Sequence, residues 1–190
     1  MRNIWEAVAE ETSEALNDYG WSSSYGGKAF SLEEMQEYIG NFQTKLKPHL
    51  TKESKVLEVG CGHGLLLFHL APDVKEYVAT DLSGTIIERN RERARWEGLS
   101  HVKLRQAAAS EIGGIGESDF DVIVMSSVVH YFPNTLYLEE VIRSAIGLLK
   151  EEGILYLDGF ADHWKKGELA ESDGGLQRGQ PGCSGQNKLG

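Results

Sequence analysis

Short apolar runs alternate with amphipathic stretches through the middle of this chain, and that alternation restricts its fold more than any other feature. The run FDVIVM, at residues 120–125, is typical of a strand that is buried on both faces. Residues 84–97 and 135–149 carry apolar groups at helical spacing. Strands that alternate with helices of this length form right-handed βαβ units. We therefore predict an α/β fold with a doubly wound, mainly parallel sheet, whose strands lie at residues 56–59, 77–80, 102–104, 120–125 and 154–157.

The chain divides into three segments. Residues 1–50 are expected to form N-terminal helices and a lid, with one helix over residues 3–19 and a second opened by the capping box of Ser31 and Glu34. Residues 51–166 hold the alternating core. Residues 167–190 are rich in Gly, Ser and Gln and show little apolar periodicity, so we expect a disordered tail there.

Charge and cysteine content exclude several classes of protein. With 19 Lys and Arg against 29 Asp and Glu, the net charge is −10, which argues against a nucleic-acid partner because phosphate binding needs a basic face. No apolar run approaches the length of a membrane span, and the acidic N-terminus is unlike a signal peptide. Cys61 and Cys183 form neither a metal-binding spacing nor a disulfide framework. We predict a cytoplasmic protein with no nucleic-acid or membrane partner and no bound metal.

The segment LEVGCGHG, from Leu57 to Gly64, carries the strongest chemical signal. Glycine at alternate positions after a strand lets the backbone turn tightly and lets a ligand lie against the main chain. The helix after this turn offers N–H groups to polar ligand atoms. Asp81 ends the next strand, beside this turn, where its carboxylate can accept both hydroxyls of a ribose. Together these features predict an adenosine-type ligand; the alternative is an ordinary tight turn and a helix cap.

The acid Glu58 narrows the choice of cofactor. The glycines are spaced G-x-G-x-G, whereas a dinucleotide fingerprint has G-x-G-x-x-G, and the chain has no P-loop motif. A carboxylate two residues before Gly60 repels a pyrophosphate but can orient the cationic end of S-adenosylmethionine. The sequence therefore excludes NAD and favours S-adenosylmethionine.

Three segments, VLEVGCGHG, YVATD and FDVIVMSSVVHYFPN, resemble the motifs of class I S-adenosylmethionine-dependent methyltransferases. Three others, YGWSSSYGGKAFSLEEM, GLLLFHLAP and SSVVHYFPN, are similar to methyltransferase domains embedded in polyketide synthases and nonribosomal peptide synthetases. Those domains methylate oxygen, nitrogen or carbon of an acyl or peptidyl chain that a carrier protein holds as a thioester. The resemblance, over roughly residues 20 to 160, implies S-adenosyl-L-methionine as cofactor, S-adenosyl-L-homocysteine as product and a carrier protein as partner.

The resemblance also implies a cofactor-binding set. Glu58 and the three alternate glycines would line the methionine portion, Asp81 would hold the ribose, and Leu82 would lie against the adenine. Many class I enzymes place an adenine-binding acid after the third strand, and backbone groups of Ala107 and Ala108 would take that role here. The whole set is Trp21, Tyr25, Glu58, Gly60, Gly62, Gly64, Asp81, Leu82, Ala107, Ala108, Ser126 and Ser127.

The remaining members of that set lie near the reacting group. Ser126 and Ser127 end the fourth strand, where the family's residues meet the methionine end of the cofactor and the substrate. Trp21 and Tyr25 would belong to a lid over the cofactor; the alternative is a hydrophobic plug.

His130 is the predicted catalytic base. A hydroxyl acceptor needs a positioned base because its pKa is far above neutral, and an imidazole suits that role, whereas an amine acceptor needs only to be neutral. We therefore favour O-methylation of a hydroxyl on a carrier-bound polyketide or peptide intermediate. His130 could instead cap the helix that begins near Asn134. His163, next to Asp162, is the second candidate base, with a loop position as the alternative.

The segment after the fifth strand departs from the family. Methyltransferases of this class continue with a reversed hairpin of two strands, and the remaining residues here do not offer two good strands, so the hairpin is expected to be absent. Two other functions stay open. One is methylation of an amine or of a free small molecule, and the other is a non-catalytic scaffold or partner domain that keeps the cofactor fold.

Overall fold

A single mixed sheet organises the described part of the protein. The computed structural model describes Glu6, residues 32–158 and residues 163–165. The strand order is β3-β2-β1-β4-β5-β6. Five strands run parallel and the sixth is antiparallel to β5, which confirms the predicted doubly wound, mainly parallel sheet. The strands are β1 (Lys55–Val59), β2 (Glu76–Asp81), β3 (Val102–Gln106), β4 (Phe120–Ser126), β5 (Leu149–Asp158) and β6 (His163–Lys165).

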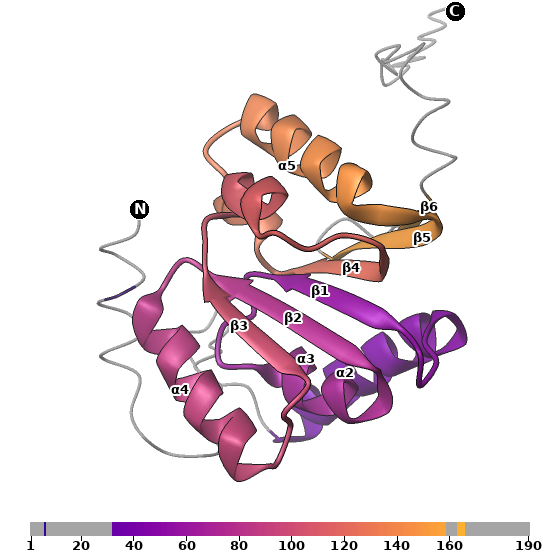
Figure 1. Cartoon of the computed structure of the whole chain (residues 1–190), viewed down its shortest axis with the longest axis vertical. Coiled ribbons are helices and arrows are strands. Elements are labelled where there is room, and N and C mark those ends of the chain that lie inside the picture. Colours follow the sequence, from indigo (N-terminus) through magenta and orange to yellow (C-terminus); the bar gives the residue numbers. More distant parts are fainter. Residues whose placement is uncertain (1–5, 7–31, 159–162, 166–190) are drawn as a thin grey trace, which may run out of the picture.

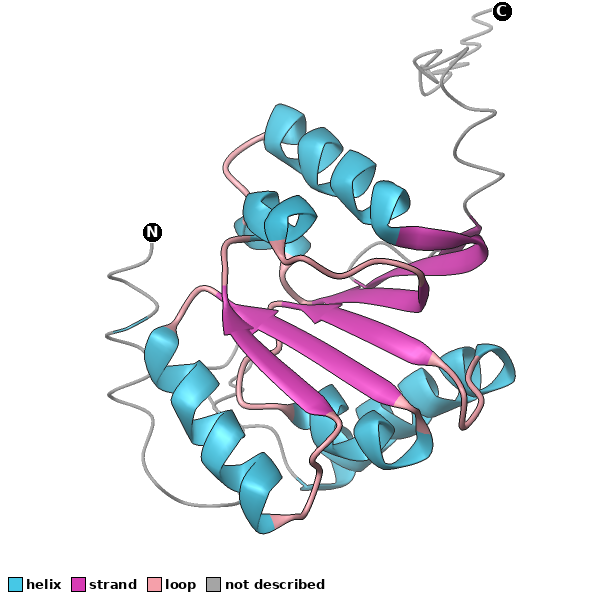
Figure 2. Cartoon of the chain, in the orientation of Figure 1, coloured by secondary structure: helices cyan, strands magenta, loops and turns pink. Residues whose placement is uncertain are grey.

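Helices cover both faces of this sheet (Figures 1 and 2). Side chains of α2, α3 and α4 pack with one face of the central strands, and α5 and the turn η3 pack on the other. The α-helices are α2 (Leu32–Leu46), α3 (Leu65–Leu70), α4 (Gly84–Trp96) and α5 (Thr135–Leu148). The 3₁₀ helices are η1 (Lys47–His49), η2 (Ala71–Asp73), η3 (Ala109–Gly114) and η4 (Val129–Tyr131).

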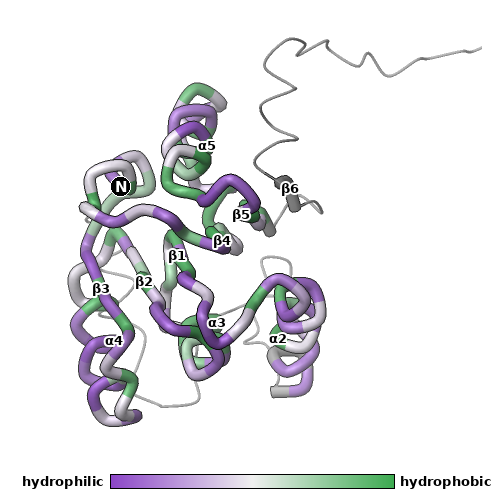
Figure 3. The backbone as a smooth tube through the Cα atoms, turned by 45° about the vertical axis from the view of Figure 1, so that its right-hand side comes forward, coloured by the Kyte–Doolittle hydropathy of each residue, from purple (hydrophilic) through white to green (hydrophobic). Residues whose placement is uncertain are grey.

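Burial on both faces explains why the central strands are so apolar. In β1, Val56 packs in the cluster of α2, α3 and α4, and its neighbour Leu57 packs in the cluster of α5; both are fully buried. Val122 and Ile123 divide β4 in the same way. Figure 3 shows this pattern, with apolar stretches in the central strands and a largely hydrophilic α4 at the edge. A parallel sheet covered by helices on both sides requires this composition.

Helix ends reflect the local chemistry of the sequence. The Ser83 hydroxyl accepts a hydrogen bond from the Ile86 N–H at 3.2 Å and opens α4, and Gly98, with φ +71°, lies just beyond its end. The Asn134 side chain accepts a hydrogen bond from the Tyr137 N–H at 2.9 Å and opens α5. Asn134 is therefore the cap of this helix, and His130, which lies in η4, is not.

The fifth strand and the segment after it differ from the sequence prediction. β5 begins at Leu149, directly at the end of α5, because Phe120 pairs with Leu149 before the register shifts toward Ile154. After it, β6 pairs antiparallel with β5, so the described residues contain one short reversed strand that the sequence analysis did not assign. Apart from Glu6, the predicted helix over residues 3–19 lies outside the described residues. So do Trp21, Tyr25, Asp162 and the predicted tail at 167–190. No helix in the described ranges has the length and apolar character needed to cross a lipid bilayer.

Candidate functional site

Glu58, the three glycines and Asp81 of the predicted cofactor set lie where β1 and β2 end. The two strands run parallel in register, with Val59 beside Thr80, so the turn after β1 and the acid after β2 emerge at the same edge of the sheet. We call residues 60–64 the glycine turn. It leads from β1 into α3, as the sequence predicts for a ligand-binding turn of a doubly wound sheet.

All three glycines of this turn have positive φ, but only one has open space beside it. The φ values of Gly60, Gly62 and Gly64 are +77°, +47° and +80°. A Cβ on Gly60 would lie 2.7 Å from Val128 Cγ2, and one on Gly64 would lie 2.5 Å from Phe68 Cε2. A Cβ on Gly62 would meet nothing within 4 Å. Gly60 and Gly64 are thus required by packing, and Gly62 is the position where a ligand can approach the main chain.

Backbone amides of the glycine turn are bound to the end of β2. The N–H groups of Gly60 and Cys61 both donate to the Thr80 carbonyl, at 2.8 and 2.9 Å, and the Gly62 N–H donates to Asp81 Oδ2 at 2.9 Å. These three bonds fix the shape of the turn. They do not involve the N–H groups of the helix after the turn, which the sequence predicts as the groups offered to the ligand.

Asn90 of α4 also holds the glycine turn, and the sequence analysis did not identify it. Its Nδ2 donates to the Gly62 carbonyl at 2.7 Å, and the side chain is buried. A signal was available: Asn90 is a polar residue at the helical spacing of the buried Ile86, Ile87 and Ala94. A polar side chain on a buried helix face must find a partner, and here that partner is the turn.

Asp81 links the glycine turn to the start of α4. Besides the bond from Gly62, its Oδ1 accepts a hydrogen bond from the Ser83 N–H at 2.9 Å. Burial raises the pKa of Asp81, and the hydrogen bonds from the Ser83 and Gly62 backbones oppose that rise. A carboxylate has further lone pairs, so these two bonds leave it able to accept the ribose hydroxyls that the sequence assigns to it.

Glu58 is buried directly behind the turn. It is 3% exposed, and its Oε2 accepts a hydrogen bond from the Tyr77 hydroxyl at 3.0 Å. Burial raises the pKa of Glu58 to about 8, the Tyr77 hydrogen bond opposes the rise, and the charge of Asp81 adds to it. A cation next to this carboxyl would favour its ionised form, which fits the predicted orienting role toward the cationic end of the cofactor.

The predicted adenine end is already hydrogen-bonded internally. Leu82 offers its carbonyl to Gln106 Nε2 at 3.1 Å. The N–H of Ala107 donates to the Asp81 carbonyl at 2.9 Å, and that of Ala108 donates to Glu111 Oε2 at 2.7 Å. Recognition of adenine by the backbone of Ala107 and Ala108 remains a prediction. It cannot involve these two N–H groups while they donate to Asp81 and Glu111.

Glu6 reaches the same corner from the N-terminal segment. Its carboxylate accepts hydrogen bonds from the Gly84 N–H and the Ser83 hydroxyl, both at 2.7 Å. The hydrogen bond from Ser83, and to a smaller extent that from Gly84, lowers the pKa of Glu6 to about 2. An anion at the first turn of a helix is favourable, so Glu6 holds the start of α4. The sequence analysis did not find this contact, because the two partners are 78 residues apart.

Three hydroxyl groups gather at the end of β4, and we call Tyr38, Ser126 and Ser127 the hydroxyl cluster. The Tyr38 hydroxyl, from α2, lies 2.5 Å from Ser126 Oγ and 3.2 Å from Ser127 Oγ. Ser127 has φ +52°, a conformation that side chains other than glycine rarely adopt. Ser126 and Ser127 were predicted from the sequence. Tyr38 was not, because with Phe42 it has the spacing of an ordinary apolar helix face.

Neither of the two candidate bases, His130 and His163, belongs to the hydroxyl cluster. His130 is exposed, and its ring lies 4.0 Å from that of Tyr131 between centroids. Among the residues that the structure describes, no side chain forms a hydrogen bond with His130. The backbone of His163 lies in β6, where it pairs with Tyr156 of β5. The catalytic roles of both remain predictions.

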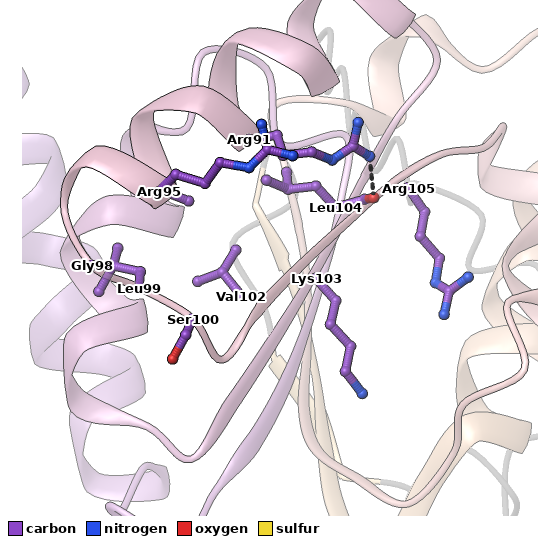
Figure 4. Close-up of a pocket in the computed structure, with 10 residues that line it drawn as sticks. Arg91, Arg95, Gly98, Leu99, Ser100, Val102, Lys103, Leu104 and Arg105 are labelled. Atoms are coloured by element: carbon purple, nitrogen blue, oxygen red, sulfur yellow. Dashed lines mark hydrogen bonds between the residues drawn. The ribbon is translucent and has the colours of Figure 1, made fainter.

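A separate groove of about 580 Å³ lies between α4 and β3 (Figure 4). Basic residues line much of it, including Arg91, Arg95 and Arg105. The Arg91 Nη2 donates to the Leu104 carbonyl at 2.9 Å, and Arg105 pairs with Glu117. The lining contains no residue of the glycine turn and none of the hydroxyl cluster, so the groove is distinct from the candidate site.

Comparison with known proteins decides the family. Residues 57–155 match a family model described as "Methyltransferase domain", which is more than half of the chain. The chain belongs to this methyltransferase family. It is an S-adenosylmethionine-dependent methyltransferase, which confirms the predictions of family, enzyme class and cofactor.

Peptide synthetases are among the curated relatives of this methyltransferase. It is 36% identical over 165 residues to the "Probable non-canonical nonribosomal peptide synthetase (NRPS) CymA" of Salinispora arenicola, with 84% of this chain and 2% of that protein covered. It is 39% identical over 162 residues to the "Chondramide synthase cmdD" of Chondromyces crocatus, with 80% of this chain and 4% of that protein covered. The chain thus spans a small fraction of the length of these relatives.

A solved structure supports the fold of the methyltransferase. Phosphoethanolamine N-methyltransferase 1 of Haemonchus contortus, in complex with phosphoethanolamine and S-adenosylhomocysteine, matches with a TM-score of 0.67 at 18% identity. The match covers 85% of this chain and 33% of that one. At this level of identity the likeness concerns the Rossmann-like architecture.

Proposed function

We propose that this methyltransferase acts on the nitrogen of an aminoacyl or peptidyl intermediate that a carrier protein holds as a thioester. The cofactor supplies the methyl group. Two observations support the intermediate: the resemblance to domains embedded in synthases, and relatives of more than 30% identity that are peptide synthetases.

The observation that carries the proposal is the open space beside Gly62. Asp81 accepts the Gly62 N–H, the buried Glu58 comes two residues before the turn in β1, and Val128, next to the hydroxyl cluster, packs against Gly60. The chain's own residues would therefore bind the donor through the turn and the two acids. They would receive the acceptor at the end of β4.

The surroundings of His130 favour nitrogen over oxygen. A neutral amine attacks without losing a proton first, whereas a hydroxyl needs a base that is held in position. His130 is exposed, and within the described chain no carboxylate orients its ring. We therefore favour a nitrogen acceptor over the oxygen acceptor that the sequence analysis favoured.

O-methylation with His130 as the general base is the second candidate function. The position of His130 supports it, since His130 lies in η4, three residues after Ser127, at the edge where the acceptor would enter.

A mass-spectrometric assay separates these functions. Carrier proteins loaded with matched aminoacyl, hydroxyacyl and β-ketoacyl chains are incubated with S-adenosylmethionine and the methyltransferase. The proposal expects the mass of one methylene to appear on the aminoacyl chain. Methylation of the hydroxyacyl chain alone would contradict it. Calorimetric titration with S-adenosylmethionine, expected to show micromolar-scale binding, tests the cofactor independently of any acceptor.

His130→Gln sharpens the same comparison. A general base for a hydroxyl contributes about 10²–10⁴-fold to kcat, so the oxygen hypothesis expects a loss of that size with unchanged cofactor affinity. The nitrogen hypothesis expects turnover of the aminoacyl carrier within a few fold of the parent. A large loss on the aminoacyl carrier would show that nitrogen transfer also depends on His130.

A further inference from the structure

The hydroxyl cluster has features of a binding subsite rather than of packing alone. Three hydroxyl groups from two elements meet there, with Tyr38 Oη 2.5 Å from Ser126 Oγ and 3.2 Å from Ser127 Oγ. Ser127 is one of two described residues other than glycine with positive φ. Such strained positions are held by the surrounding structure and concentrate at ligand sites.

The cluster lies next to the donor side of the site. Val128 comes directly after Ser127, and its Cγ2 occupies the space that a Cβ on Gly60 would need. β4 also pairs with β1, with Val124 beside Glu58. The end of β4 and the glycine turn are therefore neighbours, and a group bound at the hydroxyl cluster would be close to a ligand beside Gly62.

Hydroxyl oxygens suit an amine acceptor. A neutral primary amine has two N–H donors and one lone pair, and each hydroxyl group has two lone pairs that can accept a hydrogen bond. Two N–H groups held by two oxygens fix the direction of the lone pair. Fixing a reacting atom in this way is how positioning accelerates a transfer.

We propose that Tyr38, Ser126 and Ser127 form the subsite that orients the acceptor amine, with Tyr38 as the residue that α2 contributes to it. This inference rests on the proposed nitrogen acceptor. In the transfer, the acceptor nitrogen forms a bond to the methyl carbon as the bond from that carbon to sulfur breaks. The sulfonium becomes the neutral thioether of S-adenosylhomocysteine, and the product ammonium loses its proton to water.

Tyr38→Phe is the first test, because it removes the hydroxyl and keeps the ring, whose centroid lies 4.9 Å from that of the Phe42 ring. We expect kcat/KM for an aminoacyl carrier to fall by about 10–100-fold, the scale of a misplaced reacting group. The dissociation constant for S-adenosylhomocysteine should stay within about twofold, as a positioning role confined to the acceptor requires. Ser126→Ala should give a loss of the same order, and the double variant should lose less than the product of the two.

Thr44→Val is the matched control, since it removes another hydroxyl of α2, one that donates to the Gly40 carbonyl of the same helix. It should leave kcat/KM unchanged. Parental kcat/KM in Tyr38→Phe would overturn the subsite.

A second measurement does not depend on turnover. In protein with ¹³C-labelled tyrosine and saturating S-adenosylhomocysteine, the Tyr38 ring signal is assigned by its loss in Tyr38→Phe. An aminoacyl-pantetheine probe should shift that signal saturably, and no shift would overturn the subsite. The proposed function is tested separately, with the parent protein. If the parent binds the amine probe but methylates no aminoacyl carrier, the proposed function is wrong and the subsite stands.

Discussion

The glycine turn and the hydroxyl cluster lie at the same edge of the sheet but are built in different ways. Backbone bonds to the end of β2 shape the glycine turn, as in the pair of N–H groups that share the Thr80 carbonyl. Side-chain hydroxyls from two elements form the hydroxyl cluster, and Tyr38 reaches it from 88 residues away in the chain. A donor site made of backbone tolerates change in few positions, whereas an acceptor site made of side chains can change its substrate by single substitutions.

Gly62→Val should have the largest effect on the donor side. The branched side chain would fill the open space beside the turn, so we expect a loss of more than about 100-fold in affinity for S-adenosylmethionine, measured by calorimetry. Positive φ adds strain of the order of 1–2 kcal/mol, and circular dichroism should still show the folded protein. Gly98→Val is the control, because Gly98 also has positive φ and open space but lies after α4. Normal binding by Gly62→Val would show that the turn does not touch the cofactor.

Asp81→Asn should come next. The change removes the charge from the carboxylate that we assign to two ribose hydroxyls, and charge-assisted bonds contribute about 1.5–3 kcal/mol, so the dissociation constant should rise by roughly 10–100-fold. Asp73→Asn removes the same charge from an exposed acid and should bind as the parent does. Equal affinities for the parent and Asp81→Asn would contradict the ribose assignment.

Glu58 makes the stability of the protein depend on pH. Its pKa is about 8 in the folded protein, against the ordinary glutamic acid value of 4.5, so between these values the folded protein holds a proton that the unfolded chain releases. The free energy of unfolding should therefore fall as pH rises through this window. Glu58→Gln should flatten that fall and raise stability near pH 8 by an amount of the order of 1–3 kcal/mol in urea unfolding. The exposed Glu92→Gln should leave the slope as it is; an unchanged slope in Glu58→Gln would refute the raised pKa.

Glu6→Gln should have the smallest effect. Neutralising the acid at the start of α4 weakens its bonds to Ser83 and Gly84, and affinity for S-adenosylhomocysteine should fall by about twofold to fivefold. With a pKa of about 2, the carboxylate stays charged at neutral pH, and its contribution is lost only as pH falls below about 4.5 toward about 2. The ratio of variant to parent affinity should then be constant between about pH 6 and about pH 9. A ratio that changes over this range would mean that another group responds.

The fold and the position of the glycine turn could be predicted from the sequence because their signals are local. The alternation of strands and helices fixes the parallel sheet, and a contiguous run holds Gly60, Gly62 and Gly64, with Asp81 at the end of the next strand. Even here the sequence pattern makes the three glycines look equal. Only the structure separates Gly62 from two positions that neighbouring side chains require.

Contacts between distant segments could not be predicted in the same way. Tyr38 and Phe42 have the periodicity of a buried helix face, and nothing in that pattern says that one hydroxyl meets the end of β4. Glu6 likewise has no local signal for its bonds to α4. For His130 the outcome was partial: Asn134 proved to be the helix cap, which removes one alternative and leaves the role of the imidazole as a prediction.

The hydrogen bonds of the glycine turn also set what ligand binding can change in solution. The N–H groups of Gly60, Cys61 and Gly62 are engaged in bonds to Thr80 and Asp81 in the protein alone. These amides should therefore exchange slowly with solvent deuterium before any cofactor arrives, and binding should add little to their protection. A loop that is ordered beforehand loses little conformational freedom on binding, so the entropy cost of capturing the cofactor falls mainly on the cofactor itself.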